Sequence, residues 1–156
     1  MFIFDFHNIP DGYFFLYCSL IKKKSFNKVK FDKSIVKYGH DDTELSFQLS
    51  LLEAKVNHIE NPVEHGDIDS SLVYLKKTKE ALENLMLLYK NRQIDSNFVK
   101  LILLFKWLSN LKLTYMISKC YLLLEKNIFK NLKGNNPNLL AFNLFRIGYL
   151  CTLKTN

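Results

Sequence analysis

The chain has 156 residues, 48% of them hydrophobic, and a formal net charge of +7. This length suits a single domain, and this apolar content is enough for a buried core, which excludes wholesale disorder. The chain has only five Gly and three Pro, which favours long helices over a turn-rich β-fold. Its three widely separated cysteines exclude a disulfide framework and indicate a reducing compartment.

The charge is divided unevenly along the chain. Residues 41–69 contain eight acidic side chains and one base, Lys55, whereas residues 70–134 contain twelve Lys and Arg against four Asp and Glu. A basic surface of this kind attracts nucleic acid or an acidic peptide, and it is also the composition of an ordinary solvated helix face. Composition alone leaves both interpretations open.

Residues 1–40 have no clear helical period. Aromatic runs flank the turn signal Pro10-Asp11-Gly12, and residues 22–30 are basic, so the segment is compatible with a small hairpin or with no fixed structure. No stretch has the roughly 18 unbroken apolar residues of a membrane-spanning helix. We expect residues 1–40 to add little to a stable unit formed by residues 41–134.

The first helix is predicted to start at Asp42. Asp41 or Asp42 can cap its start, and it is predicted to end at Asn61, because a residue before proline is pushed out of the α region. Its apolar stripe has helical spacing and consists of Leu45, Leu49, Leu52, Val56 and Ile59.

Two further helices follow. Residues 69–71, an Asp and two Ser, are good N-caps for a helix that runs to about Lys90. The next helix, residues 98–109, is apolar almost all round. Such a helix is normally central in a bundle, so we predict that Trp107 lies in the core.

The fourth helix is predicted over residues 113–132, after a short corner at residues 110–112. Gly134 stands where a helix-ending residue in the left-handed conformation is expected. Residues 135–156 then form a C-terminal extension, in which residues 139–145 are compatible with a short helix. The predicted apolar stripe of the fourth helix consists of Ile117, Cys120, Leu124, Ile128 and Leu132.

Residues that carry catalysis or bind metals form no known motif. The sequence contains no Gly-rich phosphate loop, no nucleophile elbow and no H-E-x-x-H. His58 and His65 lie near Glu60 and Glu64, but this spacing matches no zinc pattern. Cys120 lies on an apolar stripe and is expected to pack as a small hydrophobe. We therefore expect no enzymatic activity, no metal and no cofactor.

Two patterns resemble the integrase-binding domain of the lens epithelium-derived growth factor and hepatoma-derived growth factor-related proteins. Residues 81–88, ALENLMLL, are similar to A-L-x-x-L-x-x-L in the second helix of that family. The family's F-K-V corner and the helix after it are matched by Leu111, Lys112, Leu113, Ile117, Lys119, Phe129, Lys130 and Asn131. The resemblance covers residues 49–134, a little over half of the chain.

The resemblance implies an all-α fold, a compact bundle of four to five helices built from two αα-hairpins and similar to the N-terminal domain of transcription elongation factors. It implies a non-enzymatic tethering function in the nucleus, linked to chromatin and transcription. Family members bind disordered acidic peptides with an F-x-G-F core at one end of the bundle, and some retroviral integrases use the same end. The family's Pro-Trp-Trp-Pro-like chromatin reader has no counterpart here, since Trp107 is the only tryptophan.

Carried across, the resemblance implies a peptide-binding site formed by Ile68, Asp69, Leu111 and Leu113. Ile68 and Asp69 match the family's first-loop pair, which supplies an apolar wall and a carboxylate that accepts backbone amide hydrogen bonds. Leu111 and Leu113 match the second-loop walls, one of which is aromatic in the family and offers more contact area. Asp69 is also a good N-cap, and both leucines also suit a bundle core.

Two other functions stay open. The basic helical surface suits a nucleic-acid-binding protein, whose affinity falls steeply with salt. The aromatic N-terminal segment beside Lys22, Lys23 and Lys24 suits a membrane-surface protein. The tethering hypothesis itself expects protein partners and no membrane.

Overall fold

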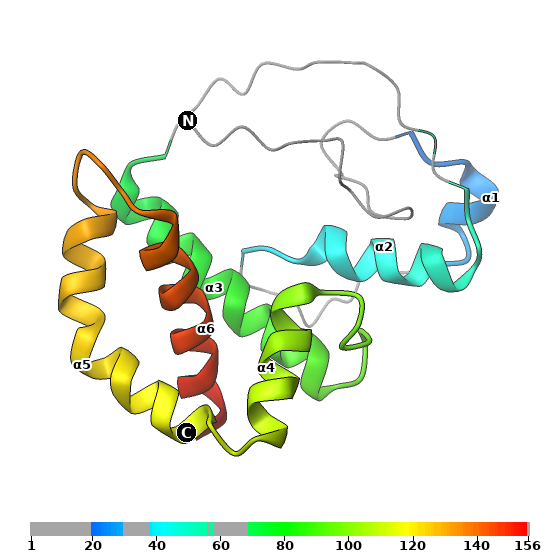
Figure 1. Cartoon of the computed structure of the whole chain (residues 1–156). Helices are drawn as coiled ribbons and strands as arrows, with labels where there is room; N and C mark the ends of the chain where they lie inside the picture. The colour runs from blue at the N-terminus through cyan, green and yellow to red at the C-terminus, as the bar shows by residue number, and fades with distance from the viewer. Residues whose placement is uncertain (1–19, 30–37, 56, 58–68, 156) are drawn as a thin grey trace. The chain divides into compact units, whose positions relative to one another are not determined.

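The computed structural model describes residues 20–29, 38–55, 57 and 69–155 (Figure 1). Every regular element in these ranges is a helix, which confirms the all-α class. The chain divides into two compact units, one containing α1 and α2 and the other containing α3 to α6. The helices are α1 (Lys23–Phe26), α2 (Asp41–Leu51), α3 (Ser71–Lys90), α4 (Lys100–Asn110), α5 (Thr114–Leu132) and α6 (Leu139–Thr155).

The start of α2 differs from the prediction. His40 is the N-cap residue, in the left-handed conformation at φ 70°, so neither Asp41 nor Asp42 has that role. Both acids lie in the first turn, where the helix dipole favours negative charge. The carboxylate of Asp42 accepts a hydrogen bond from the Thr43 amide at 2.8 Å.

The end of α2 also differs, because the helix stops at Leu51, ten residues before Asn61. Of the predicted stripe, Leu45 and Leu49 lie in the helix and are buried with Val29. Leu52 lies beyond the helix end and is exposed. The rest of the stripe and the Asn-Pro stop signal fall outside the described residues.

Three helices end in the same way, without glycine. After α2, α3 and α4 the left-handed position is taken by Glu53, Arg92 and Lys112, at φ between 50° and 58°. At α4, Lys112 N–H donates to Ser109 at 3.0 Å and Leu113 N–H donates to Leu108 at 2.9 Å. These two bonds are those of a Schellman ending, which satisfies carbonyls at the helix terminus.

Gly134 does not adopt the predicted left-handed conformation. The last residue of α5 is followed by Lys133 at φ −89°, and Gly134 N–H donates to the Asn131 carbonyl at 3.0 Å. Of the described glycines, Gly39 is the one with a positive φ, at 95°.

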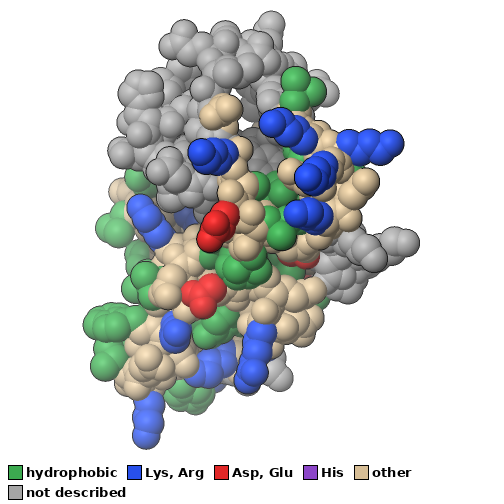
Figure 2. Space-filling model, turned by 90° about the vertical axis from the view of Figure 1, so that its right-hand side faces the viewer, with side chains coloured by type: hydrophobic (Ala, Val, Ile, Leu, Met, Phe, Trp, Pro, Cys, Tyr) green, Lys and Arg blue, Asp and Glu red, His purple; other side chains and the backbone are tan. Residues whose placement is uncertain are grey.

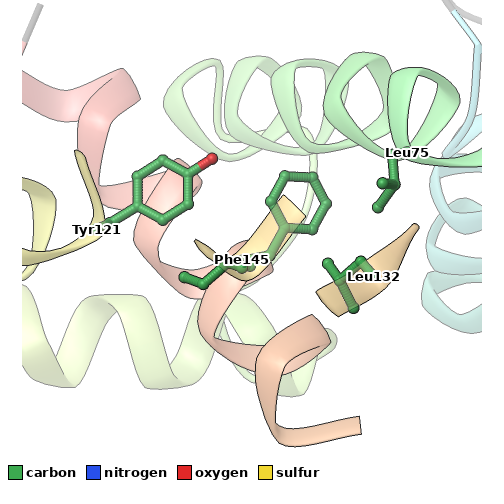
Figure 3. Packing of buried hydrophobic residues seen from close by; sticks show 5 residues of the cluster. Leu75, Tyr121, Leu132 and Phe145 are labelled. Atoms are coloured by element: carbon green, nitrogen blue, oxygen red, sulfur yellow. The ribbon is translucent and has the colours of Figure 1, made fainter. Parts of the chain in front are cut away.

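The second unit is centred on a hairpin of α5 and α6, which pack more extensively than any other described pair of helices. Phe145 of α6 is fully buried, and Figure 3 shows it among Tyr121, Leu132 and Leu75. Gly148 allows the two helices to approach closely, since a Cβ there would lie 2.6 Å from Tyr121. The C-terminal segment therefore belongs to the core of this unit, although the sequence predicts a separate extension at residues 135–156.

Helix α3 lies along α6 in the same direction. Near the helix starts, the rings of Tyr74 and Phe142 stack with centroids 5.9 Å apart. Near the helix ends, Lys90 Nζ donates to the Leu153 carbonyl at 3.2 Å. Figure 1 shows α3 and α6 side by side.

The apolar faces of α4 and α5 are oriented differently from the prediction. Trp107 is 57% exposed and does not lie in the core. On α5, Cys120 and Leu124 are exposed, whereas Tyr121 and Ser118 are buried. Only the last two members of the predicted α5 stripe, Ile128 and Leu132, face the core.

Tyr38 and Gly39, just before α2, contact α3. A Cβ on Gly39 would lie 2.7 Å from the Cβ of Ala81, so only glycine fits this contact. The buried Asn84 amide donates to the carbonyls of Tyr38 at 3.2 Å and Gly39 at 3.0 Å.

Candidate functional site

The first two predicted site residues lie at the start of α3. Ile68 falls outside the described residues. Asp69 is exposed and forms an ion pair with Lys77 at 2.7 Å. The N-cap role belongs to Ser70, whose hydroxyl accepts from the Val73 amide at 3.4 Å.

The other two predicted site residues, Leu111 and Leu113, lie at the corner between α4 and α5. Leu111 is 50% exposed and Leu113 is partly buried. The corner lies near the end of α6, because Lys154 donates to Ser109. Asp69 precedes α3, whose first turns lie beside the start of α6. The structure therefore does not bring Asp69 together with the two leucines.

The described residues instead form an apolar groove between α3 and α5. Its volume is about 410 Å³. Leu75 and Phe129 are buried or partly buried at its base. Leu72 and Val73, at 60% and 43% exposure, are open to solvent. The groove is lined by Leu72, Val73, Leu75, Lys76, Lys79 and Phe129.

The two lysines of the groove have different surroundings. The Lys76 side chain is 81% exposed, and its ammonium lies 4.0 Å from Glu80, a separation at which a surface pair contributes little. Lys79 is held firmly, with its ammonium 3.0 Å from Glu125 and 4.8 Å from the centre of the Phe129 ring. An anionic group of a ligand in the groove can therefore pair with Lys76, with little competition from Glu80.

A network of polar side chains continues from Lys79 into the unit. The Tyr121 hydroxyl donates to Glu125 at 2.9 Å, and the Tyr149 hydroxyl donates to Glu83 at 2.6 Å. The ammonium of Lys79 also lies 4.9 Å from the centre of the Tyr149 ring. Within this network, the Lys79–Glu125 pair joins α3 to α5 beside the groove, and the Tyr149–Glu83 hydrogen bond joins α6 to α3.

The ionisation of this network follows from burial and its hydrogen bonds. Burial disfavours the charged form of Glu125, but hydrogen bonds from Lys79 and Tyr121 and the lysine charge outweigh it and lower the pKa of the carboxyl. Burial, with the hydrogen bond to Glu125, raises the pKa of Tyr121. Burial, with the hydrogen bond to Glu83, raises the pKa of Tyr149. Both phenols are therefore protonated at neutral pH and donate hydrogen bonds, which is a structural role.

The described ranges contain neither a metal-binding cluster nor a helix that could cross a membrane. There, no group of three or more His, Cys, Asp and Glu side chains could hold a metal ion. The pair His58 and His65 lies outside these ranges. No helix within them is long and apolar enough to cross a membrane.

Lysine and arginine side chains stand among hydrophobic ones on the face shown in Figure 2, where acidic side chains are fewer.

The sequence contained a signal for the groove that the prediction did not use. Leu72, Lys76 and Lys79 are spaced four and three residues apart, which places them on one face of a helix. The opposing Phe129 depends on tertiary packing and has no local signal.

Comparisons with families of known proteins, with curated proteins and with solved structures gave no match.

Proposed function

We propose that the protein is a non-enzymatic interaction module that binds a short disordered peptide in the groove between α3 and α5. The observation that carries the proposal is an open apolar groove with an exposed lysine at its edge. Its volume of about 410 Å³ suits one or two large apolar side chains, since small-ligand pockets start at roughly 300 Å³. The function needs no cofactor.

The chemistry of the groove selects an aromatic peptide with acidic flanks. An aromatic ring can pack on Leu75 and Phe129 and bury apolar area. A carboxylate beside it can pair with Lys76, which assists capture more than final affinity. Because a disordered peptide loses chain entropy when it binds, we expect modest affinity.

The resemblance to the integrase-binding domain supports this class of partner. A peptide with an F-x-G-F core and acidic flanks supplies both the rings and the charges that the groove favours. We accordingly propose a nuclear role in tethering proteins of transcription and chromatin, with retroviral integrase as a further partner of the same class. Asp69 lies three residues before Leu72 and is a candidate acceptor for peptide amides once it leaves Lys77.

Fluorescence anisotropy with a labelled acidic F-x-G-F peptide tests the proposal. Leu72→Asp should weaken binding by at least about tenfold, because it places a carboxylate without a partner in an apolar groove that receives an acidic peptide. Leu139→Asp is the matched control, since Leu139 is 59% exposed on α6 and does not line the groove. Equal binding by the parent and Leu72→Asp would exclude the groove.

A salt titration separates this proposal from nucleic-acid binding, which the excess of lysine favours. Peptide binding driven by apolar contacts should change little with salt, whereas nucleic-acid affinity falls linearly with the logarithm of salt concentration. Steep salt dependence with an oligonucleotide, together with no peptide binding, would favour the nucleic-acid function.

A further inference from the structure

The outer face of α4 is exposed and apolar. Leu103, Leu104, Trp107 and Leu111 have exposed fractions between 43% and 57%. Their spacing places them on one side of the helix, and the buried Phe105 lies on the other. A patch of large apolar side chains that no other helix of the second unit covers is typical of an interaction surface.

Most of the charges around this face are positive. Lys100 begins α4, Lys106 lies within it, and Lys112 follows its end, and α4 contains no acidic residue. The nearest acidic residues along the chain are Asp95, five residues before Lys100, and Glu125, which pairs with Lys79 on another helix. Two copies of this face would place lysines against lysines, so the charge disfavours self-association and favours an anionic partner.

We propose that the outer face of α4 docks on a membrane surface that contains anionic phospholipid. A convex helix face bearing Trp and Leu suits a deformable interface, where these side chains enter the boundary between headgroups and acyl chains. The long side chains of Lys100 and Lys112, both exposed, can then reach the phosphate groups. Trp107 suits that depth, because its ring combines an apolar body with a polar N–H.

This surface is separate from the groove and was not expected from the sequence. The tethering hypothesis expected no membrane, and the helix was predicted to be central because nearly all its residues are apolar. The structure buries only Ile102, Phe105 and Leu108 of α4. The remaining apolar side chains are what a peripheral membrane contact requires.

Trp107 is the only tryptophan, so its fluorescence reports directly on this face. The full chain should be mixed with phosphatidylcholine vesicles, with and without phosphatidylserine. We expect a blue shift of the emission, and quenching by brominated acyl chains, only when phosphatidylserine is present. The protein should also float with these vesicles in a density gradient.

The double variant Leu103→Ser/Leu111→Ser keeps the fluorophore and should weaken vesicle binding by at least about tenfold. Leu139→Ser/Leu140→Ser is the matched control, because both leucines are at least as exposed but lie on α6. Circular dichroism should show that both variants keep their helices.

Three results would overturn the proposal. The first is no emission change with anionic vesicles while the protein is folded. The second is equal flotation of the parent and the α4 variant, which would assign membrane binding to another surface. The third is an emission shift with an acidic amphipathic peptide but none with vesicles, which would assign the face to a protein partner.

Discussion

Two cysteines of the second unit lie in opposite environments. Cys151 on α6 is fully buried, and burial raises the pKa of its thiol to about 11. Cys120 on α5 is exposed. Because the thiolate is the reactive form, burial and a raised pKa both protect Cys151 from alkylation.

We therefore expect iodoacetamide, at mildly alkaline pH, to label Cys120 and to leave Cys151 unmodified until the protein unfolds. Peptide mass spectrometry after a short exposure measures both sites in one sample. A denatured sample is the control, in which both cysteines should react. Rapid labelling of Cys151 in the native protein would show that this part of α6 is not buried.

The left-handed conformation of Lys112 strains the end of α4. Such a conformation costs an L-residue roughly 1–2 kcal/mol, and glycine adopts it freely. Lys112→Gly should therefore raise the free energy of unfolding by about 1 kcal/mol, measured by urea denaturation. Lys126→Gly, at an exposed helical position of α5, should lower it by about 1 kcal/mol. A loss of stability in both variants would contradict the observed ending.

At the scale of the helices, the close approach of α5 and α6 depends on Gly148. Glycine is normally unfavourable within a helix, so Gly→Ala substitutions usually stabilise. Gly148→Ala should do the reverse and cost about 1–3 kcal/mol, because the added methyl meets Cβ and Cγ of Tyr121, which cannot move without the helix.

Thermal denaturation measures this cost. Asn143→Ala, at an exposed position on the same helix, is the control and should change stability little. If Gly148→Ala melts at or above the parent temperature, the two helices are further apart than the structure indicates.

The helices themselves could largely be predicted from the sequence, and their packing could not. The bounds of α3, α4 and α5 lie within about two residues of the prediction, whereas α6 runs ten residues beyond the short helix predicted at residues 139–145. The end of α2 was missed because Glu53, and not glycine, takes the left-handed position. The buried side of α5 was missed because Tyr121 and Ser118, rather than Cys120, are buried, with Tyr121 packed against α6.

The candidate site was less predictable than the fold. Asp69 and Leu111 were chosen by resemblance, and their separation depends on how α3 and α5 run past α6, which no local pattern specifies. The apolar character of α4 led to the prediction that the helix is buried in the centre of the bundle, although apolar side chains also occupy interaction surfaces. Periodicity identifies an apolar face but does not identify what covers it.

At the scale of the whole molecule, the second unit includes α6. A fragment of residues 67–156 should keep its helical circular dichroism and unfold cooperatively, because it contains the core around Phe145. A fragment of residues 41–134 lacks α6 and leaves Tyr121 and Phe129 without their main aromatic partner. It should melt at a lower temperature or not cooperatively. A stable 41–134 fragment would restore the boundary expected from the sequence.

The hydrogen bond from the Asn84 amide to the Gly39 carbonyl has a consequence for the order of folding. These residues are 45 positions apart, so their contact closes a long loop, whereas α5 and α6 are neighbours in the chain and meet after a short connection. Loop-closure entropy favours the local pair, so we expect the α5–α6 hairpin to form early and the Asn84 bonds late. In pulsed hydrogen exchange during refolding, the helical amides of α5 and α6 should be protected before the side-chain amide of the buried Asn84. The segment that leads into α2 would then be the last part of the second unit to form on refolding and the first to open under mild denaturant.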